Sequence, residues 1–131
     1  MEGDFILTVE VAPLPIKNDA AGISAWPRAG LMIRASSDVS ANLASIFRRS
    51  GSNETENRKQ VRADSRAAGA VKSTTATLAT ASEWLRLKLV RCGGTVYAYA
   101  APESAPDAWQ LVATELVPFG DRVLAGFFVT K

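Results

Sequence analysis

Histidine is absent from this sequence of 131 residues, and cysteine occurs once. The absence of histidine excludes Ser-His and Cys-His catalysis, most zinc sites and the usual general base near neutral pH. The single cysteine, Cys92, excludes a disulfide within the chain. The sequence therefore excludes the commonest hydrolytic and metal-dependent mechanisms.

Long apolar runs are also missing. No stretch reaches the roughly 18 apolar residues that indicate a membrane-spanning helix. The first residues, MEGDFILTVEVAP, are acidic and alternating, unlike the basic start and apolar block of a signal peptide. We expect no membrane association and a cytoplasmic protein, or an extracellular one if the chain is a fragment of a larger exported protein.

Positive charge is present but in small excess. The net charge of +2 is too small to indicate nucleic-acid binding by itself. Residues 48–72 are more basic, with seven Lys or Arg against three Asp or Glu. Only Phe47 offers an aromatic ring near them, whereas single-strand binding needs rings among the basic residues. We expect no nucleic-acid partner.

Alternation of apolar and polar residues runs through most of the chain, and no segment has helical periodicity. The pattern predicts strands at 3–11, 30–36, 42–50, 58–66, near 70, 84–92, 95–101, 109–117 and 122–130. Closely spaced turn signals favour one all-β domain over residues 1–131, built as an antiparallel sandwich or barrel. The core candidates are Phe5, Leu7, Val9, Leu31, Ile33, Leu85, Leu87, Leu89, Ala98 and Phe128.

One hairpin can be predicted with its register. Leu85, Leu87 and Leu89 share one face of a strand, and the Gly93-Gly94 pair suits a two-residue turn. With this turn, Leu87 pairs with Ala100 and Leu89 with Ala98 on one face of the hairpin. Lys88 pairs with Tyr99 and Val90 with Tyr97 on the other face. A slip of one residue would mix the two faces.

Four stretches together resemble a family: GDFILTVEV, AWPRAGLMIRAS, WLRLKLVRCGGTVYAYAA and RVLAGFFVT. They are similar to small bacterial domains of unknown function in the concanavalin A-like lectin/glucanase superfamily. Trp26 and residues 28–34 match the family's second element, residues 84–87 the third and Gly126 the last. The family's Ser-x-Asp-Gly-x-x-Trp turn is replaced here by APESAPDAW.

The resemblance implies a jelly-roll-like fold with one or two strands before the Gly-Asp-Phe element, which begins here at residue 3. We therefore predict an all-β, antiparallel two-sheet β-sandwich of concanavalin A-like type that lacks its first strand. Such a gap exposes backbone groups and apolar surface, which self-association could cover. We expect a homodimer or a higher even oligomer, with the first or last strand in the interface.

The second face of the hairpin is the candidate ligand site. Flat aromatic rings can support the apolar face of a sugar while polar groups bind its hydroxyls. The predicted ligand-binding residues are Arg34, Trp84, Arg86, Lys88, Tyr97 and Tyr99. The alternatives are a plain solvated sheet face and structural pairing of Arg34. We expect Trp26 and Trp109 to fill the ends of the core, and the alternative for them is a sugar platform.

Hydrolysis of a glycan would need two carboxylates about 5–10 Å apart. Glu54 and Glu56 alternate, but they lie in a polar loop without an aromatic frame. We therefore predict no enzyme activity, no catalytic residue, no metal and no cofactor. The predicted function is a lectin-like binding domain, with a glycan as the ligand that the resemblance implies. The alternative is a self-associating interaction or structural module without a small ligand.

Overall fold

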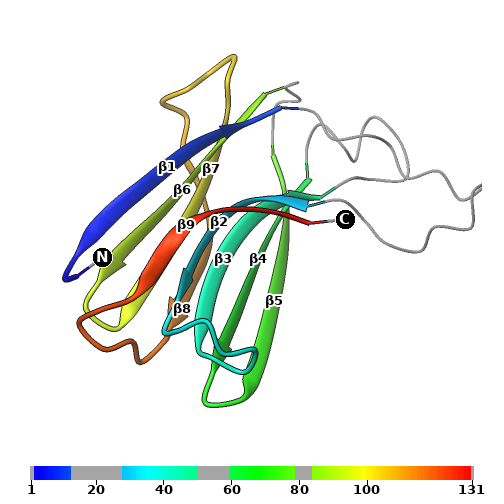
Figure 1. Cartoon of the computed structure of the whole chain (residues 1–131). Helices are drawn as coiled ribbons and strands as arrows, with labels where there is room; N and C mark the ends of the chain where they lie inside the picture. The colour runs from blue at the N-terminus through cyan, green and yellow to red at the C-terminus, as the bar shows by residue number, and fades with distance from the viewer. Residues whose placement is uncertain (1, 13–27, 50–59, 79–83, 131) are drawn as a thin grey trace, which may run out of the picture.

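The computed structural model describes residues 2–12, 28–49, 60–78 and 84–130. These residues form nine strands (Figure 1). The strands are β1 (Phe5–Val11), β2 (Arg28–Arg34), β3 (Leu43–Arg49), β4 (Gln60–Ala67), β5 (Ala70–Thr77), β6 (Leu85–Cys92), β7 (Thr95–Pro102), β8 (Gln110–Leu116) and β9 (Leu124–Thr130). No helix long and apolar enough to cross a membrane occurs in these four ranges.

The strands form two antiparallel sheets that pack face to face, so the predicted β-sandwich is confirmed. One sheet has four strands in the order β1-β6-β7-β8, and the other has five in the order β5-β4-β3-β2-β9. β1 and β9 are edge strands and lie on the same side of the sandwich (Figure 1).

The central hairpin has the predicted register. Lys88 pairs with Tyr99, Leu89 with Ala98, and Cys92 with Thr95. Gly93 has a φ of 61°, which a two-residue hairpin turn of type II′ requires at its first central position. The turn and the alternation of Leu85, Leu87 and Leu89 therefore agree on which residues face inward.

The core lies between the two sheets, where alternate residues of facing strands are buried. Every leucine of β6 is fully buried, as are Leu31 and Ile33 of β2. The prediction for Phe128 is wrong. Phe128 of β9 lies opposite Gly30 of β2 and points to the outer face of the five-stranded sheet. Its ring packs edge-to-face on Phe47, with 5.7 Å between the ring centroids.

Candidate functional site

The predicted residues of the hairpin lie together on the outer face of the four-stranded sheet. Arg86 and Lys88 come from β6, and Tyr97 and Tyr99 come from β7. All four alternate with buried neighbours, and each is half-buried. Because Lys88 lies directly opposite Tyr99 in the sheet, the cation and the ring are held side by side.

Trp109 completes this face, contrary to the expectation that it fills the core. The Lys88 ammonium lies 4.2 Å from the Trp109 ring centroid and 4.8 Å from that of Tyr99. The Arg86 guanidinium lies 5.1 Å from the same indole ring. Contacts of this kind are favourable within about 6 Å of a ring centroid. We call the five residues the aromatic–cationic face: Arg86, Lys88, Tyr97, Tyr99 and Trp109.

A bulge in β8 explains why Trp109 was missed. Ala98 pairs with Ala113, but the next residue, Tyr99, pairs with Leu111, so Val112 is an extra residue. Strict alternation from Ala113 would have placed Leu111 and Trp109 inward. After the bulge, Leu111 shares the outer face with Tyr99, and Trp109 follows on the same side.

Polar groups surround the rings. Glu10 of β1 lies opposite Arg86, and their charged atoms, Oε1 and Nε, are 3.8 Å apart. Arg86 also donates a hydrogen bond of 2.9 Å to the Pro106 carbonyl, which anchors the loop that carries Trp109. Thr8 is the β1 neighbour of Lys88. A ligand on this face would meet two cations, a carboxylate and a hydroxyl next to the rings.

Arg34 does not belong to this face, so its assignment to the same site is wrong. It lies on β2 in the five-stranded sheet. Its guanidinium donates to the Ser36 carbonyl at 3.1 Å and to the Asp38 carbonyl, which fixes the turn after β2. Hydrogen bonds from the Ser40 N–H and hydroxyl lower the pKa of Asp38, and the charge of Arg34 acts in the same direction. Arg34 therefore has a structural role in this loop.

Trp84 is also separated from the aromatic–cationic face. It precedes β6 and lines a groove with Val9 of β1 and Phe127 of β9. The next residue, Leu85, pairs with Pro102 at the last position of β7. Trp84 therefore lies beyond the end of β7 that is far from Tyr97. Alternation correctly indicated the two sides of β6, but it does not hold beyond the strand's end.

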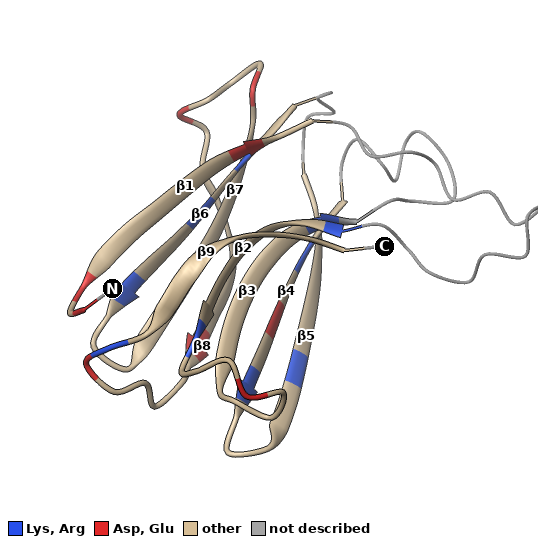
Figure 2. Cartoon of the chain, in the orientation of Figure 1, with Lys and Arg blue, Asp and Glu red and all other residues tan. Residues whose placement is uncertain are grey.

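Several basic residues of segment 48–72 make internal contacts. Arg48 is buried and donates to the Val11 carbonyl at 3.1 Å. Arg62 pairs with Asp64 at 2.9 Å. Figure 2 shows Lys and Arg distributed over several strands rather than gathered on one strand. The residues Trp26, Glu54 and Glu56 lie outside the described residues.

A second hollow lies on the outer face of the five-stranded sheet. Its volume is about 200 Å³, and it is lined by Arg28, Phe47, Asp64 and Phe128 among others. The Arg28 guanidinium lies 5.4 Å from the Phe47 ring centroid. The hollow is lined by two cations, Arg28 and Arg66, and two rings, Phe47 and Phe128. The aromatic–cationic face offers two cations and three rings. The larger array is the stronger candidate for binding an extended polar ligand.

Comparison with known proteins shows the family. The model of a family described as "Protein of unknown function (DUF1583) C domain" matches residues 1–129. A solved structure of a functionally unknown protein from Saccharomyces cerevisiae is similar in fold, with a TM-score of 0.51 and 14% sequence identity. The match covers 95% of this chain and 64% of the yeast chain. The search of curated proteins gave no significant match. Because the family model spans nearly the whole sequence, the chain belongs to the DUF1583 C-domain family.

Proposed function

We propose that this domain is a non-enzymatic, lectin-like binding module that holds a glycan on the aromatic–cationic face. The observation that carries the proposal is the placement of Lys88 between two rings, Tyr99 and Trp109, on the outer face of a sheet. Pyranose rings have apolar faces that stack on such side chains, and their hydroxyls accept hydrogen bonds from Lys and Arg.

The charges of the face favour an acidic glycan over a neutral one. Glu10 partly neutralises Arg86. Lys88 has no carboxylate partner in the ion pairs of the described residues. A uronic acid or sulfate group would supply the missing anion, and the contact with Lys88 would be strengthened by its charge. The ligand class rests on the geometry of the face and on the resemblance to lectin-like domains.

The first experiment is a glycan array that contains both neutral and acidic members. We expect binding to acidic glycans that weakens as salt is added, because exposed charge pairs are screened. Titration calorimetry with one bound glycan then tests the residues. Replacing both Tyr99 and Trp109 with Ala should lower the affinity about 10- to 100-fold, since each stacked ring contributes about 1 kcal/mol. Lys88→Gln should remove the preference for acidic glycans.

Arg34→Ala is the matched control, because it removes a cation from the other sheet without touching the face. Its affinity should equal that of the unmodified chain. The pair Tyr97→Ala and Tyr99→Ala tests the hairpin alone and should also abolish most binding. An unchanged affinity in both double variants would contradict the proposal. Hydrolysis of the bound glycan would contradict its non-enzymatic part.

A further inference from the structure

The interior side of strand β9 has two large apolar side chains that the described residues leave uncovered. Phe127 lies opposite Leu31, and Val129 lies opposite Ala29. Those partners are buried in the core, and residues directly opposite in an antiparallel pair share a face. Phe127 and Val129 are nevertheless 76% and 78% exposed. The described part of the four-stranded sheet therefore ends before it covers β9.

The groove left between β1 and β9 is one strand wide. β1 packs over β2, and β9 follows β2 as the last strand of its sheet. A strand added beside β1 would lie over β9, whereas a second added strand would have no described strand of the five-stranded sheet to face. The groove has a volume of about 420 Å³, and Val9, Val11, Phe127 and Val129 are among the residues that line it. The occupant is therefore one strand with apolar residues on its inner side.

Both edges at the groove are free and lack the devices that keep sheet edges from pairing. β1 and β9 are the last described strands of their sheets on this side. Native edges are usually protected by Lys, Pro or a bulge. The far edges have such devices, a bulge at Val112 of β8 and Lys72 on β5. The sequence of β1, FILTVEV, has no Lys, Arg or Pro, and β9, LAGFFVT, has no charged residue.

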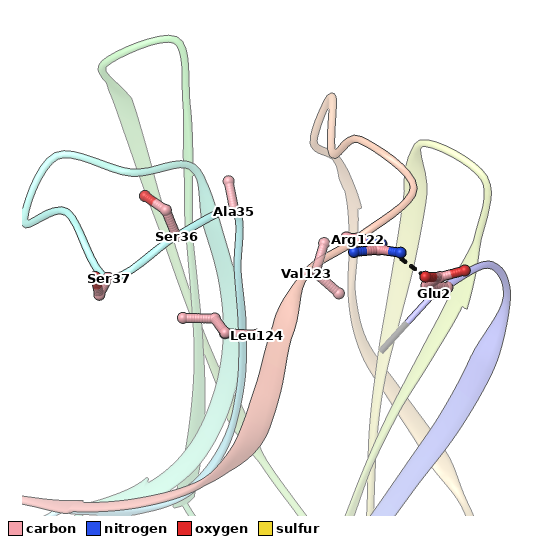
Figure 3. A pocket seen from close by; sticks show the side chains of 7 residues that line it. All are labelled: Glu2, Ala35, Ser36, Ser37, Arg122, Val123 and Leu124. Atoms are coloured by element: carbon pink, nitrogen blue, oxygen red, sulfur yellow. Dashed lines mark ion pairs between the residues drawn. The ribbon is translucent and has the colours of Figure 1, made fainter.

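β1 and β9 run in the same direction along the groove. Glu2 just before β1 and Arg122 just before β9 form a bridge, and their side chains pair at 2.7 Å (Figure 3). At the other end of both strands, Val11 and Val129 line the groove together. The two sheets are thus joined where β1 and β9 begin, and the groove is open where they end.

The choice of occupant is limited by the space over β9. The added strand needs a free edge to pair with β1 and an uncovered inner side to pack on β9. β1 of a second copy fails the second condition, because it would bring its own β2 into the space of the first β9. β9 of a second copy meets both conditions, since its edge is free and its Phe127 and Val129 are uncovered.

We infer that β9 of a second copy fills the groove, with a twofold axis that runs between the two β9 strands and along them. The second β9 pairs with the first β1 and packs on the first β9, and the symmetry repeats this contact with the roles exchanged. Each four-stranded sheet then continues into the five-stranded sheet of the other copy. The second β2 continues the same layer as the second β9, and the second β1 lies beneath that β2 and beside the first β9. Every position across the dimer therefore has one strand in each layer, and no strands overlap.

The direction of the axis determines the contacts. Rotation about an axis along the strands keeps their direction, so the second β9 is parallel to the first β1. Equivalent residues of the two β9 strands face each other, because this rotation does not shift them along the strand. Phe127 and Val129 of one copy therefore pack against the same two residues of the other, between layers about 10 Å apart. One contact closes both grooves and buries all four side chains.

The charges beside this contact are complementary. Glu10 points outward from β1, and its side chain is 55% exposed. In the dimer it lies next to β9 of the other copy, on the outer side of the other copy's five-stranded sheet. Arg28 lies on that side opposite Thr130, and it has no carboxylate partner in the ion pairs of the described residues. Glu10 and Arg28 of different copies are then separated by β9 alone and attract each other.

The dimer leaves both aromatic–cationic faces exposed and points them in opposite directions, because the axis exchanges the two layers. One dimer would therefore link two glycan chains rather than bind one chain at both sites. This consequence depends on the proposed glycan binding, whereas the dimer itself does not.

Sedimentation equilibrium of the full chain from about 1 to about 100 μM tests the inference, since specific interfaces associate in this range. We expect a dimer whose dissociation constant rises about 100-fold or more in Phe127→Glu, because two carboxylates would face each other in the closed core. Leu116→Glu on β8 is the matched control, because Leu116 is 77% exposed and lies at the far edge. Its dissociation constant should be unchanged. If Phe127→Glu does not fold by circular dichroism, Val129→Lys replaces it.

Crosslinking tests the position of the axis. In a Cys92→Ser background, a bifunctional thiol reagent that spans less than about 10 Å should join Val129→Cys into a dimer, because equivalent residues of β9 face each other. Thr75→Cys on the exposed edge strand β5 is the control and should remain monomeric on a denaturing gel. A wild-type monomer at about 100 μM would overturn the inference. So would a Phe127→Glu variant as dimeric as wild type, or equal crosslinking of the two cysteines.

Discussion

Replacing Gly30 with alanine is expected to lower the free energy of unfolding by more than about 3 kcal/mol. A Cβ atom at Gly30 would lie 2.6 Å from the Phe47 Cα and even closer to the Ile46 carbonyl oxygen. Both are backbone atoms of β3, so no side-chain rotation relieves the overlap. The rings of Phe47 and Phe128 meet over this glycine, one from each neighbouring strand. The strands β2 and β3 would have to separate, and this aromatic pair would be lost with them.

Urea unfolding followed by circular dichroism measures this effect, and the midpoint concentration is the quantity to compare. Gly126→Ala is the matched control, because Gly126 lies on the neighbouring strand and a Cβ there would meet no atom within 4 Å. It should leave stability unchanged or raise it by about 0.5 kcal/mol, since alanine restricts the unfolded chain. Equal midpoints for the two variants would show that β2 and β3 do not approach as closely as described.

The hairpin register could be predicted because polar residues alternate strictly with leucine from Leu85 to Leu89 of β6. Lys88 and Arg86 cannot be buried there without a partner, so only one face of the strand can be the inner one. The solvent-facing side of the hairpin identified in this way contains four of the six predicted site residues. This part of the prediction depends on local pattern alone and needs no knowledge of which strands are neighbours.

Arg34 was assigned to the wrong place because alternation does not say in which sheet a strand lies. Trp84 was misassigned because it precedes β6, and alternation does not hold beyond the strand's end. Arg34 faces outward as predicted, but from the other sheet. Phe128 was misassigned for a related reason. Phe127 and Phe128 are both apolar, so composition does not say which of them points inward. Phe127 points to the interior side but is exposed, because the described strands of the other sheet do not cover it. Hydrophobicity alone cannot reveal that a core position lacks its facing strand.

The turn between β4 and β5 also could not be predicted from the sequence. Ala68 and Gly69 connect β4 and β5 with φ values of 51° and 84°. Alanine seldom adopts a positive φ, so the sequence has no turn signal of the kind that Gly93-Gly94 provides. The hydrogen bond from the Ala68 N–H to the Asn42 side chain, 2.9 Å long, helps to hold this conformation. Such support from a distant residue is visible only in the folded chain.

Arg91→Met is expected to lower the free energy of unfolding by about 3 kcal/mol, because Arg91 is a buried cation that fastens a loop rather than a salt-bridge partner. It donates to the carbonyls of Gly93 at 3.1 Å and Asp121 at 3.3 Å, and also to that of Gly120. Methionine fills similar volume but donates no hydrogen bond, so these carbonyls lose their shared partner. Arg91→Lys should recover part of the loss, since lysine keeps the charge without the planar fork.

The comparison with Arg122→Met separates this role from a general loss of charge. Arg122 is exposed and forms a surface ion pair with Glu2, so its replacement should cost less than about 1 kcal/mol. The loop that Arg91 holds leads directly into β9, so a loosened loop would weaken the start of this strand. Arg91→Met should therefore raise the hydrogen-exchange rates of the β9 amides more than Arg122→Met does. A variant that loses stability while the β9 amides keep their exchange rates would show that β9 is positioned by its pairing with β2 alone.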